Sequence, residues 1–163
     1  HFNHEWGIDM RRMRDLIMLP IIDPNTGERL GWVKDIIFNQ TTNRVTGIIF
    51  EKDTFLKPQL LKIPRDDIAS FGKESVTLVK LSPQEIVGTC WSQKVGSKVY
   101  NDDGDIKGTI GDIYVDNLVQ TIVGYEISDG LFADLYKGRR AVLENNILAE
   151  SQDVVIIEGG LLS

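Results

Sequence analysis

The chain carries one stretch of sequence twice. When the sequence is shifted by 77 positions, three glycines and one aspartate fall on identical residues, with apolar residues matched between them. The matched pairs are Gly27 and Gly104, Gly31 and Gly108, Val33 and Ile110, Asp35 and Asp112, Ile36 and Ile113, Phe38 and Val115, and Gly47 and Gly124. A repeat of this length restricts the fold to two copies of one structural unit. We therefore interpret the chain as a tandem duplication.

Each copy begins with the turn chemistry of a β-hairpin. Asp23–Gly27 and Asn101–Gly104 are rich in Asp and Asn, which bond their own backbone, and each ends in a glycine, which accepts positive φ. In the strand that follows, the alternation of apolar residues slips by one position around Asp35 and Asp112. Such a slip predicts a β-bulge that bends the strand.

The third strand of each copy contains a glycine, Gly47 or Gly124, which predicts a bend or a close backbone approach. Bent strands with glycine corners close a small sheet into a barrel. The predicted fold class is all-β: two tandem small β-barrels, each of about five strands with little helix. Structural turn or bulge roles are predicted for Gly27, Gly31, Asp35, Gly47, Gly104, Gly108, Asp112 and Gly124.

The repeat also sets the predicted boundaries. Residues 10–80 form the first barrel, 81–92 a linker and 93–163 the second barrel, whereas residues 1–9 have no counterpart and are interpreted as a remnant of recombinant expression or a flexible arm. In the linker, Ser82 with Pro83 and Glu85 is suited to cap one short helical turn. A domain of roughly 75 residues is near the lower limit for a self-sufficient core, so we expect the two units to pack against each other.

The strand pattern also predicts which side chains fill the barrels. These are the apolar residues on the inward face of each strand. The predicted core contains Ile22, Val33, Ile36, Phe38, Ile48, Ile63, Ile68, Val99, Ile110, Ile113, Val115, Tyr125, Val142, Ile147 and Val155.

Charge is divided unevenly between the units. Residues 10–80 hold twelve Lys and Arg against nine Asp and Glu, a net +3, whereas residues 81–163 hold six against thirteen, a net −7. Ordinary surface variation is the interpretation we favour. The alternative is that Arg11, Arg12 and Arg14 of the first unit face an acidic partner. No basic run is long enough to indicate DNA binding.

The sequence favours a cytoplasmic protein without a membrane span. The longest apolar runs, such as Val154–Ile157, are too short to cross a bilayer. Arg11–Ile22 is superficially like a signal peptide, but Pro20 interrupts its apolar part and it occupies the first-strand position of the repeat. The single cysteine, Cys90, cannot form an internal disulfide, which fits a reducing compartment.

No constellation of residues indicates an enzyme, a cofactor or a metal site. Cys90 has no base to activate it, because the only histidines are His1 and His4. Zinc needs a cluster of His and Cys ligands, and a phosphate site needs a glycine loop between a strand and a helix. Asn101–Asp105 is partly like a calcium loop, but its glycine comes two positions early, so a hairpin turn explains it better. Asp35 and Asp112 occupy the same place in separate barrels, which favours structural roles over acid–base chemistry.

Four segments of the first unit resemble the PRC-barrel domain. The segments are Leu19–Asp23, Thr26–Phe38, Val45–Glu51 and Ile63–Ile68. The resemblance covers residues 18–80 well and residues 94–158 more loosely. The second unit departs at Val142-Leu143, which replaces Ile63-Pro64, and at Tyr100 and Glu126.

The resemblance implies a small β-barrel used for protein–protein contact, with no catalytic residues. The PRC-barrel family includes the cytoplasmic domain of the photosynthetic reaction centre H subunit and the C-terminal domain of the ribosome maturation factor RimM. It also includes stand-alone bacterial and archaeal proteins, and the tandem arrangement here is similar to those of spore-forming and related bacteria. Nothing in the chain resembles the N-terminal domain of RimM, so ribosome maturation is not implied.

Three functions remain open, and each concerns binding. We prefer an adaptor or scaffold module that binds an unknown protein partner or a second copy of itself. The alternatives are an RNA- or ribosome-associated factor that uses the basic first barrel, and a barrel that holds a small ligand.

The longer loop of the second unit supplies the candidate contact residues Phe132, Leu135 and Tyr136. Phe132 and Tyr136, like Leu131 and Leu135, are four positions apart and would share one face of a short helical turn. Such a turn would cover the first barrel or form an exposed apolar patch, which usually marks an interaction site. The competing interpretation is that these side chains close the end of their own barrel.

Overall fold

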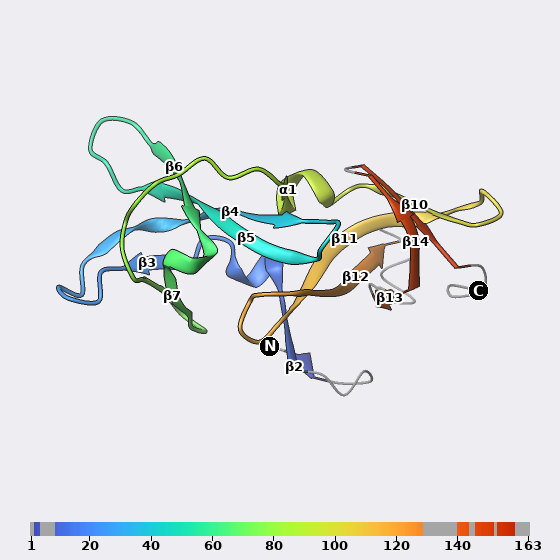
Figure 1. Cartoon of the computed structure of the whole chain (residues 1–163), viewed down its shortest axis with the longest axis horizontal. Helices are drawn as coiled ribbons and strands as arrows, with labels where there is room; N and C mark the ends of the chain where they lie inside the picture. Colours follow the sequence, from blue (N-terminus) through green and yellow to red (C-terminus); the bar gives the residue numbers. More distant parts are fainter. Residues whose placement is uncertain (1, 4–8, 129–139, 144–145, 152, 159–163) are drawn as a thin grey trace.

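The computed structural model describes residues 2–3, 9–128, 140–143, 146–151 and 153–158. Two bent β-sheets form the framework of the described chain (Figure 1). Among the described residues, each unit contributes six strands of its own, one more than predicted. None of the described helices is both long enough and apolar enough to cross a membrane.

The first sheet is built around two long antiparallel strands, β4 (Arg29–Asn39) and β5 (Arg44–Lys52). Its order is β6-β5-β4-β3-β8-β7, and all neighbours are antiparallel except β3 and β8. The remaining strands are β3 (Pro20–Ile22), β6 (Gln59–Pro64), β7 (Ile68–Phe71) and β8 (Val76–Leu78).

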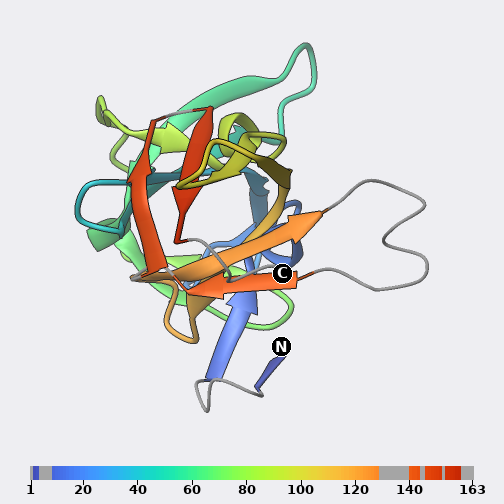
Figure 2. The ribbon, with the colours of Figure 1, turned by 90° about the vertical axis from the view of Figure 1, so that its right-hand side faces the viewer.

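The second sheet repeats this plan with β11 (Ile106–Asp116) and β12 (Ile122–Ser128) as its long pair. Its β10 and β15 are parallel, as are β3 and β8 in the first sheet. Seen along the long axis of the molecule, the strands of this unit follow a ring (Figure 2). The other strands are β10 (Lys98–Asn101), β13 (Arg140–Leu143), β14 (Ile147–Glu150) and β15 (Val154–Ile157).

A bulge bends each long strand next to the repeated aspartate. The register of β4 against β5 shifts between Val33 and Asp35, and that of β11 against β12 shifts between Ile110 and Asp112. One extra residue in each strand therefore has no partner opposite it, which is the slip that the sequence pattern indicated.

The repeated glycines are needed where the backbones of the two long strands meet. A Cβ atom at Gly31 would collide with the backbone oxygen of Glu51, and one at Gly108 would collide with that of Ser128. Glu51 and Ser128 are themselves 77 positions apart. The same close approach thus occurs in both units, which supports one fold repeated twice.

Most of the predicted core side chains are buried, and the core also contains others outside the predicted list, such as Phe50. Thirteen of the fifteen predicted side chains are buried, whereas Ile22 and Ile147 are only partly covered. Ile21, not Ile22, is fully buried, because the pairing of β3 with β4 shifts register between these two residues. Ile147 lies at the margin and packs against the core from outside.

Two short strands cross between the units and alter the predicted boundaries. β2 (Asp9–Arg12) precedes the first barrel but pairs with β11 of the second sheet. β9 (Thr89–Cys90) precedes the second barrel but pairs with β4 of the first. Residues 10–12 and part of the predicted linker are therefore exchanged between the sheets. β1 (Phe2–Asn3) pairs with β2, so the described part of residues 1–9 extends the second sheet.

A short helical turn follows each exchanged strand. The turns are η1 (Met13–Leu16) after β2 and α1 (Trp91–Lys94) after β9, so they are offset by 78 positions. No helix forms at Ser82–Glu85, where one was predicted. That segment runs beside β6 instead, with the Gln84 N–H donating to the Lys62 carbonyl at 3.1 Å. The backbone N–H of Gln84 thus forms a hydrogen bond with a neighbouring strand and not within a helical turn.

Candidate functional site: the seam between the barrels and an exposed loop

The two bulge aspartates hold the exchanged turns in matching ways. Asp35 Oδ1 accepts the N–H of Ile36 at 2.9 Å and the N–H of Ser92 in α1 at 3.2 Å. Asp112 Oδ1 accepts the N–H of Ile113 at 2.8 Å and the N–H of Arg14 in η1 at 3.2 Å. Asp35 of the first unit therefore caps α1, which precedes the second barrel, and Asp112 of the second unit caps η1, which precedes the first barrel. This geometry favours the structural role over acid–base chemistry.

The second unit adds a buried charged network to this contact. Arg12 Nε lies 3.1 Å from Asp112 Oδ2, and its Nη2 lies 2.7 Å from Glu126 Oε1. Trp91 donates to Asp112 Oδ1 at 2.9 Å, and the Tyr114 hydroxyl donates to Glu126 Oε2 at 2.6 Å. Burial, and next the hydrogen bond to Glu126, raise the pKa of the Tyr114 hydroxyl, which therefore stays protonated. In the first unit, the Ser92 hydroxyl donates to Asp35.

The loop between β4 and β5 and the loop between β11 and β12 also join the two units. The Val45 N–H donates to the Gln120 carbonyl at 2.9 Å, and the Ile122 N–H donates to the Asn43 carbonyl at 2.8 Å. Arg65 of the first unit donates to the carbonyls of Leu118 at 2.7 Å and Val119 at 2.9 Å. These contacts therefore join the two units in addition to the contacts of Asp35 and Asp112.

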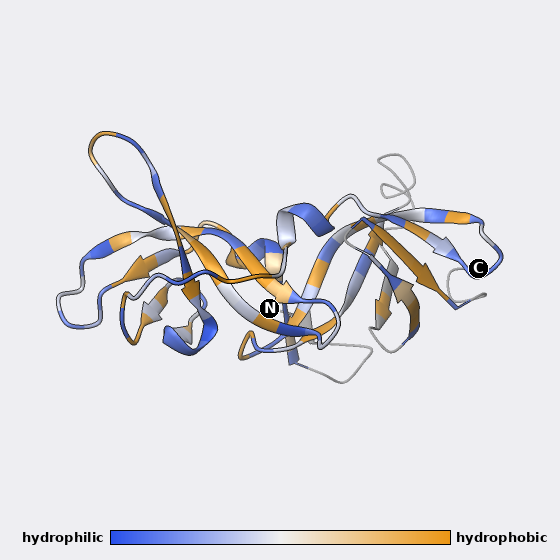
Figure 3. Ribbon diagram, turned by 45° about the horizontal axis from the view of Figure 1, so that its top comes forward, coloured by the Kyte–Doolittle hydropathy of each residue, from blue (hydrophilic) through white to orange (hydrophobic). Residues whose placement is uncertain are grey.

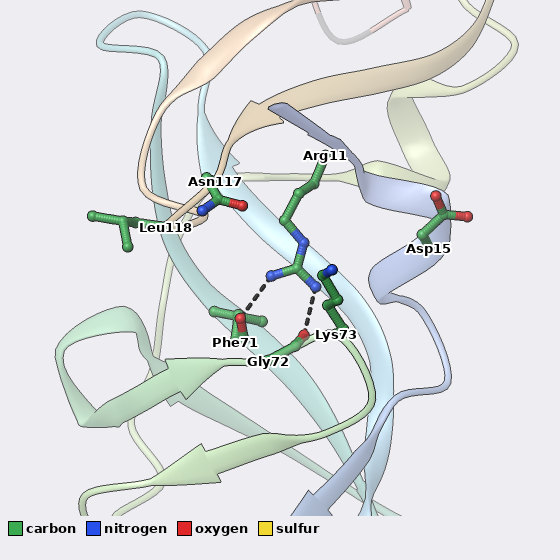
Figure 4. A pocket seen from close by; sticks show the side chains of 7 residues that line it. All are labelled: Arg11, Asp15, Phe71, Gly72, Lys73, Asn117 and Leu118. Carbon is green, nitrogen blue, oxygen red and sulfur yellow. Dashed lines mark hydrogen bonds between the residues drawn. The ribbon is translucent and has the colours of Figure 1, made fainter. Parts of the chain in front are cut away.

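A cleft opens where β2 passes the turn after β7 (Figure 4). Its volume is about 450 Å³, and it is lined by Arg11, Asp15, Phe71, Gly72, Lys73, Asn117 and Leu118. The guanidinium of Arg11 lies at its back and donates to the carbonyls of Phe71 at 2.6 Å and Gly72 at 2.5 Å. Burial lowers the pKa of Arg11, while the charge of Asp15 acts in the opposite direction. Leu118, at the rim, is 64% exposed.

The loop between β5 and β6 is a second exposed feature. Phe55 is 100% exposed and Leu56 is 90% exposed, and Leu60 at the start of β6 is 56% exposed. This loop is not among the contact sites predicted from the sequence. A signal was nevertheless present, because Phe55 and Leu56 are adjacent, lie outside any alternating strand and are followed by Pro58.

The arginine cluster of the first unit does not face outward as one patch. Arg11 binds carbonyls of the first barrel, and Arg12 binds Asp112 and Glu126. Arg14 donates to the Gly111 carbonyl at 2.7 Å. The hypothesis that these arginines face an acidic partner is therefore wrong for Arg12, because the acidic side chains that it binds belong to the second unit of the same chain.

The other candidate residues have ordinary surroundings. Burial, and then the nearby charge of Asp35, raise the pKa of the Cys90 thiol, which makes it a poor nucleophile. The Asn101 side chain accepts the N–H groups of Asp103 at 3.0 Å and Asp105 at 2.9 Å, as expected for a hairpin turn. No cluster of metal-ligating side chains occurs in the part of the chain that the structure describes. Phe132, Leu135 and Tyr136 lie outside the described residues.

Comparison with known proteins also identifies two equivalent units in the chain. The family model of the PRC-barrel domain matches the chain twice, over residues 8–80 and 91–161. The chain is also similar to the uncharacterized protein YrrD of Bacillus subtilis. The two are 26% identical over 156 residues, which span 92% of this chain and 88% of YrrD.

Proposed function

Since the chain belongs to the PRC-barrel family, with two such domains in tandem, we propose that it is a non-catalytic cytoplasmic adaptor that binds a protein partner. The partner occupies the cleft between the barrels. The observation that carries this proposal is that both units line one cleft of about 450 Å³. Small-molecule clefts of roughly 300–1,000 Å³ form preferentially at domain interfaces, and a cleft of this size also has room for side chains of a partner.

The chemistry of the cleft suits binding better than catalysis. Among the residues that the structure describes, its lining contains no Ser, Cys or His to act as a nucleophile or base. Arg11 is held by two carbonyls and so supports the wall of the cleft. Lys73, Asp15 and Asn117 supply polar groups at the rim, and Leu118 supplies an apolar surface. We infer a partner segment with an apolar side chain for Leu118 and an acidic group for Lys73.

The two alternative functions have less support. Binding of RNA through the first barrel would need its cations on the surface, and two of the twelve, Arg11 and Arg12, are used within the protein. A ligand inside a barrel would need an interior cavity. Instead, Val33, Ile36, Ile48 and Ile63 fill the first barrel with no exposed surface, as do Ile113 and Tyr125 in the second.

The proposal is tested with a substitution at the rim of the cleft. The full chain captures its partner from the native host, and the partner is then purified and titrated by calorimetry. Leu118→Asp should weaken binding by roughly tenfold or more, because it places a carboxylate where the partner's apolar and acidic groups approach. The matched control is Leu148→Asp, since Leu148 is similarly exposed at 53% but lies in β14. Equal binding by both variants and the original chain would exclude the cleft.

A further inference from the structure

We propose that the β5–β6 loop is a membrane-docking element, which inserts Phe55 and Leu56 into the headgroup region of an anionic lipid bilayer. This site is separate from the cleft and does not depend on a protein partner there. It would give the adaptor a fixed place at a lipid surface.

The loop presents its apolar residues at an apex that no other described part of the chain covers. Phe55 and Leu56 are almost completely exposed, and the apex projects from the first barrel on the side away from the second unit (Figure 1). An apolar stretch lies at the tip of this arm (Figure 3). The loop curves around a hollow of about 460 Å³, but Phe55 and Leu56 are not buried in it. A pair of large side chains that is not packed against the chain fits a fluid interface, which needs no matching shape.

The base of the loop is held in place by defined contacts. Lys52 pairs with Gln59 at the last rung of the β5–β6 ladder. The Asp53 N–H donates to the Leu30 carbonyl at 2.9 Å, and Thr54 donates its hydroxyl to the Lys57 carbonyl. The apex is thus presented by a supported turn, so little ordering entropy is lost when it inserts.

Charge around the loop favours an anionic surface. Its two acidic neighbours are engaged: Asp53 pairs with Arg29 at 3.0 Å, and Glu51 accepts the indole N–H of Trp32. Lys52 and Lys57 are exposed on either side of the apex. The first unit carries +3 and the second −7, so the loop projects from the basic half of the molecule. Basic residues beside an apolar tip are attracted to anionic headgroups, by about 1 kcal/mol each near the surface.

Vesicle sedimentation with the full chain tests this proposal. We expect binding to phosphatidylcholine vesicles that contain phosphatidylglycerol, and roughly tenfold or more weaker binding by Phe55→Ser/Leu56→Ser. The matched control is Val87→Ser/Leu148→Ser, which removes two other exposed apolar side chains, 93% and 53% exposed, and should bind as the original chain does. Lys52→Glu/Lys57→Glu should weaken binding to the anionic vesicles and reduce its salt dependence.

A second readout reports insertion directly. Phe55→Trp should show fluorescence quenching by brominated lipid beyond that of the original chain. The proposal is overturned if the original chain does not bind anionic vesicles, or if the serine pair at the apex binds as well as the control pair. It is also overturned if the apex pair abolishes capture of a protein partner while vesicle binding is unchanged, since the loop would then bind protein. Leu118→Asp should leave vesicle binding unchanged, which separates this test from that of the cleft.

Discussion

At the scale of single residues, the two repeated aspartates share a position but differ in their surroundings. Asp112 is fully buried and meets Arg12 and Trp91, whereas Asp35 is 7% exposed and meets Ser92. Removing one charge from a buried network leaves its partners without compensation, which costs far more than removing a charge held by neutral donors.

Asp112→Asn should therefore destabilise the protein more than Asp35→Asn. We expect a loss of about 2–3 kcal/mol in the free energy of unfolding for Asp112→Asn, because Arg12 then keeps only Glu126 as a counter-ion. Asp35→Asn should cost about 1 kcal/mol, because the amide oxygen still accepts the backbone N–H groups. Urea unfolding followed by circular dichroism measures both. Similar losses would show that the charge of Asp112 contributes little.

At the scale of elements, glycine permits the close approach of the two long strands. A methyl group at Gly31 would meet the backbone of Glu51, and neither side can move without breaking the β4–β5 ladder. Gly27 has a different requirement, because its φ is +73° and nothing lies within 4 Å of a built Cβ.

The substitution Gly31→Ala should thus cost more than Gly27→Ala. We expect about 2–4 kcal/mol for Gly31→Ala, through forced separation of the strands. Gly27→Ala should cost about 1–2 kcal/mol, through left-handed backbone conformation alone. Thermal unfolding of the two variants compares these costs. If Gly27→Ala proved the more damaging, turn conformation and not strand spacing would control this hairpin.

At the scale of the whole molecule, the exchanged strands make each barrel depend on the other half of the chain. The first sheet takes β9, which lies beyond the linker, and the second sheet takes β2, which lies before the first barrel. A cut near residue 80 would therefore separate β9 from the first sheet and β2 from the second sheet. Each fragment would then carry one strand without its partner.

Two fragments of similar length test this dependence. Residues 17–94 contain β3 to β9 with α1 and should form a folded first barrel, with dispersed amide signals in a proton–nitrogen NMR spectrum. Residues 9–80 contain β2 and η1 in place of β9 and α1. In this fragment β4 lacks its pairing with β9, and the buried side chains of η1, Met13 and Leu16, lack the contact of η1 with β11. We expect this fragment to be poorly dispersed. Well-resolved spectra from both fragments would show that the exchange is not needed for folding.

The sequence alone determined the duplication, the hairpin turns, the bulges and the two-barrel fold. These features are encoded locally, by turn residues, by the period of the apolar residues and by glycine spacing, so they can be read without knowing what lies nearby. Only the tertiary structure decided which sheet receives β2 and β9, because backbone groups pair equally well with either long strand. It also decided that Ile21 and not Ile22 faces inward, that Arg12 meets Glu126 across 114 positions and that Phe55 remains uncovered. Each of these outcomes depends on distances between segments that are remote in the chain.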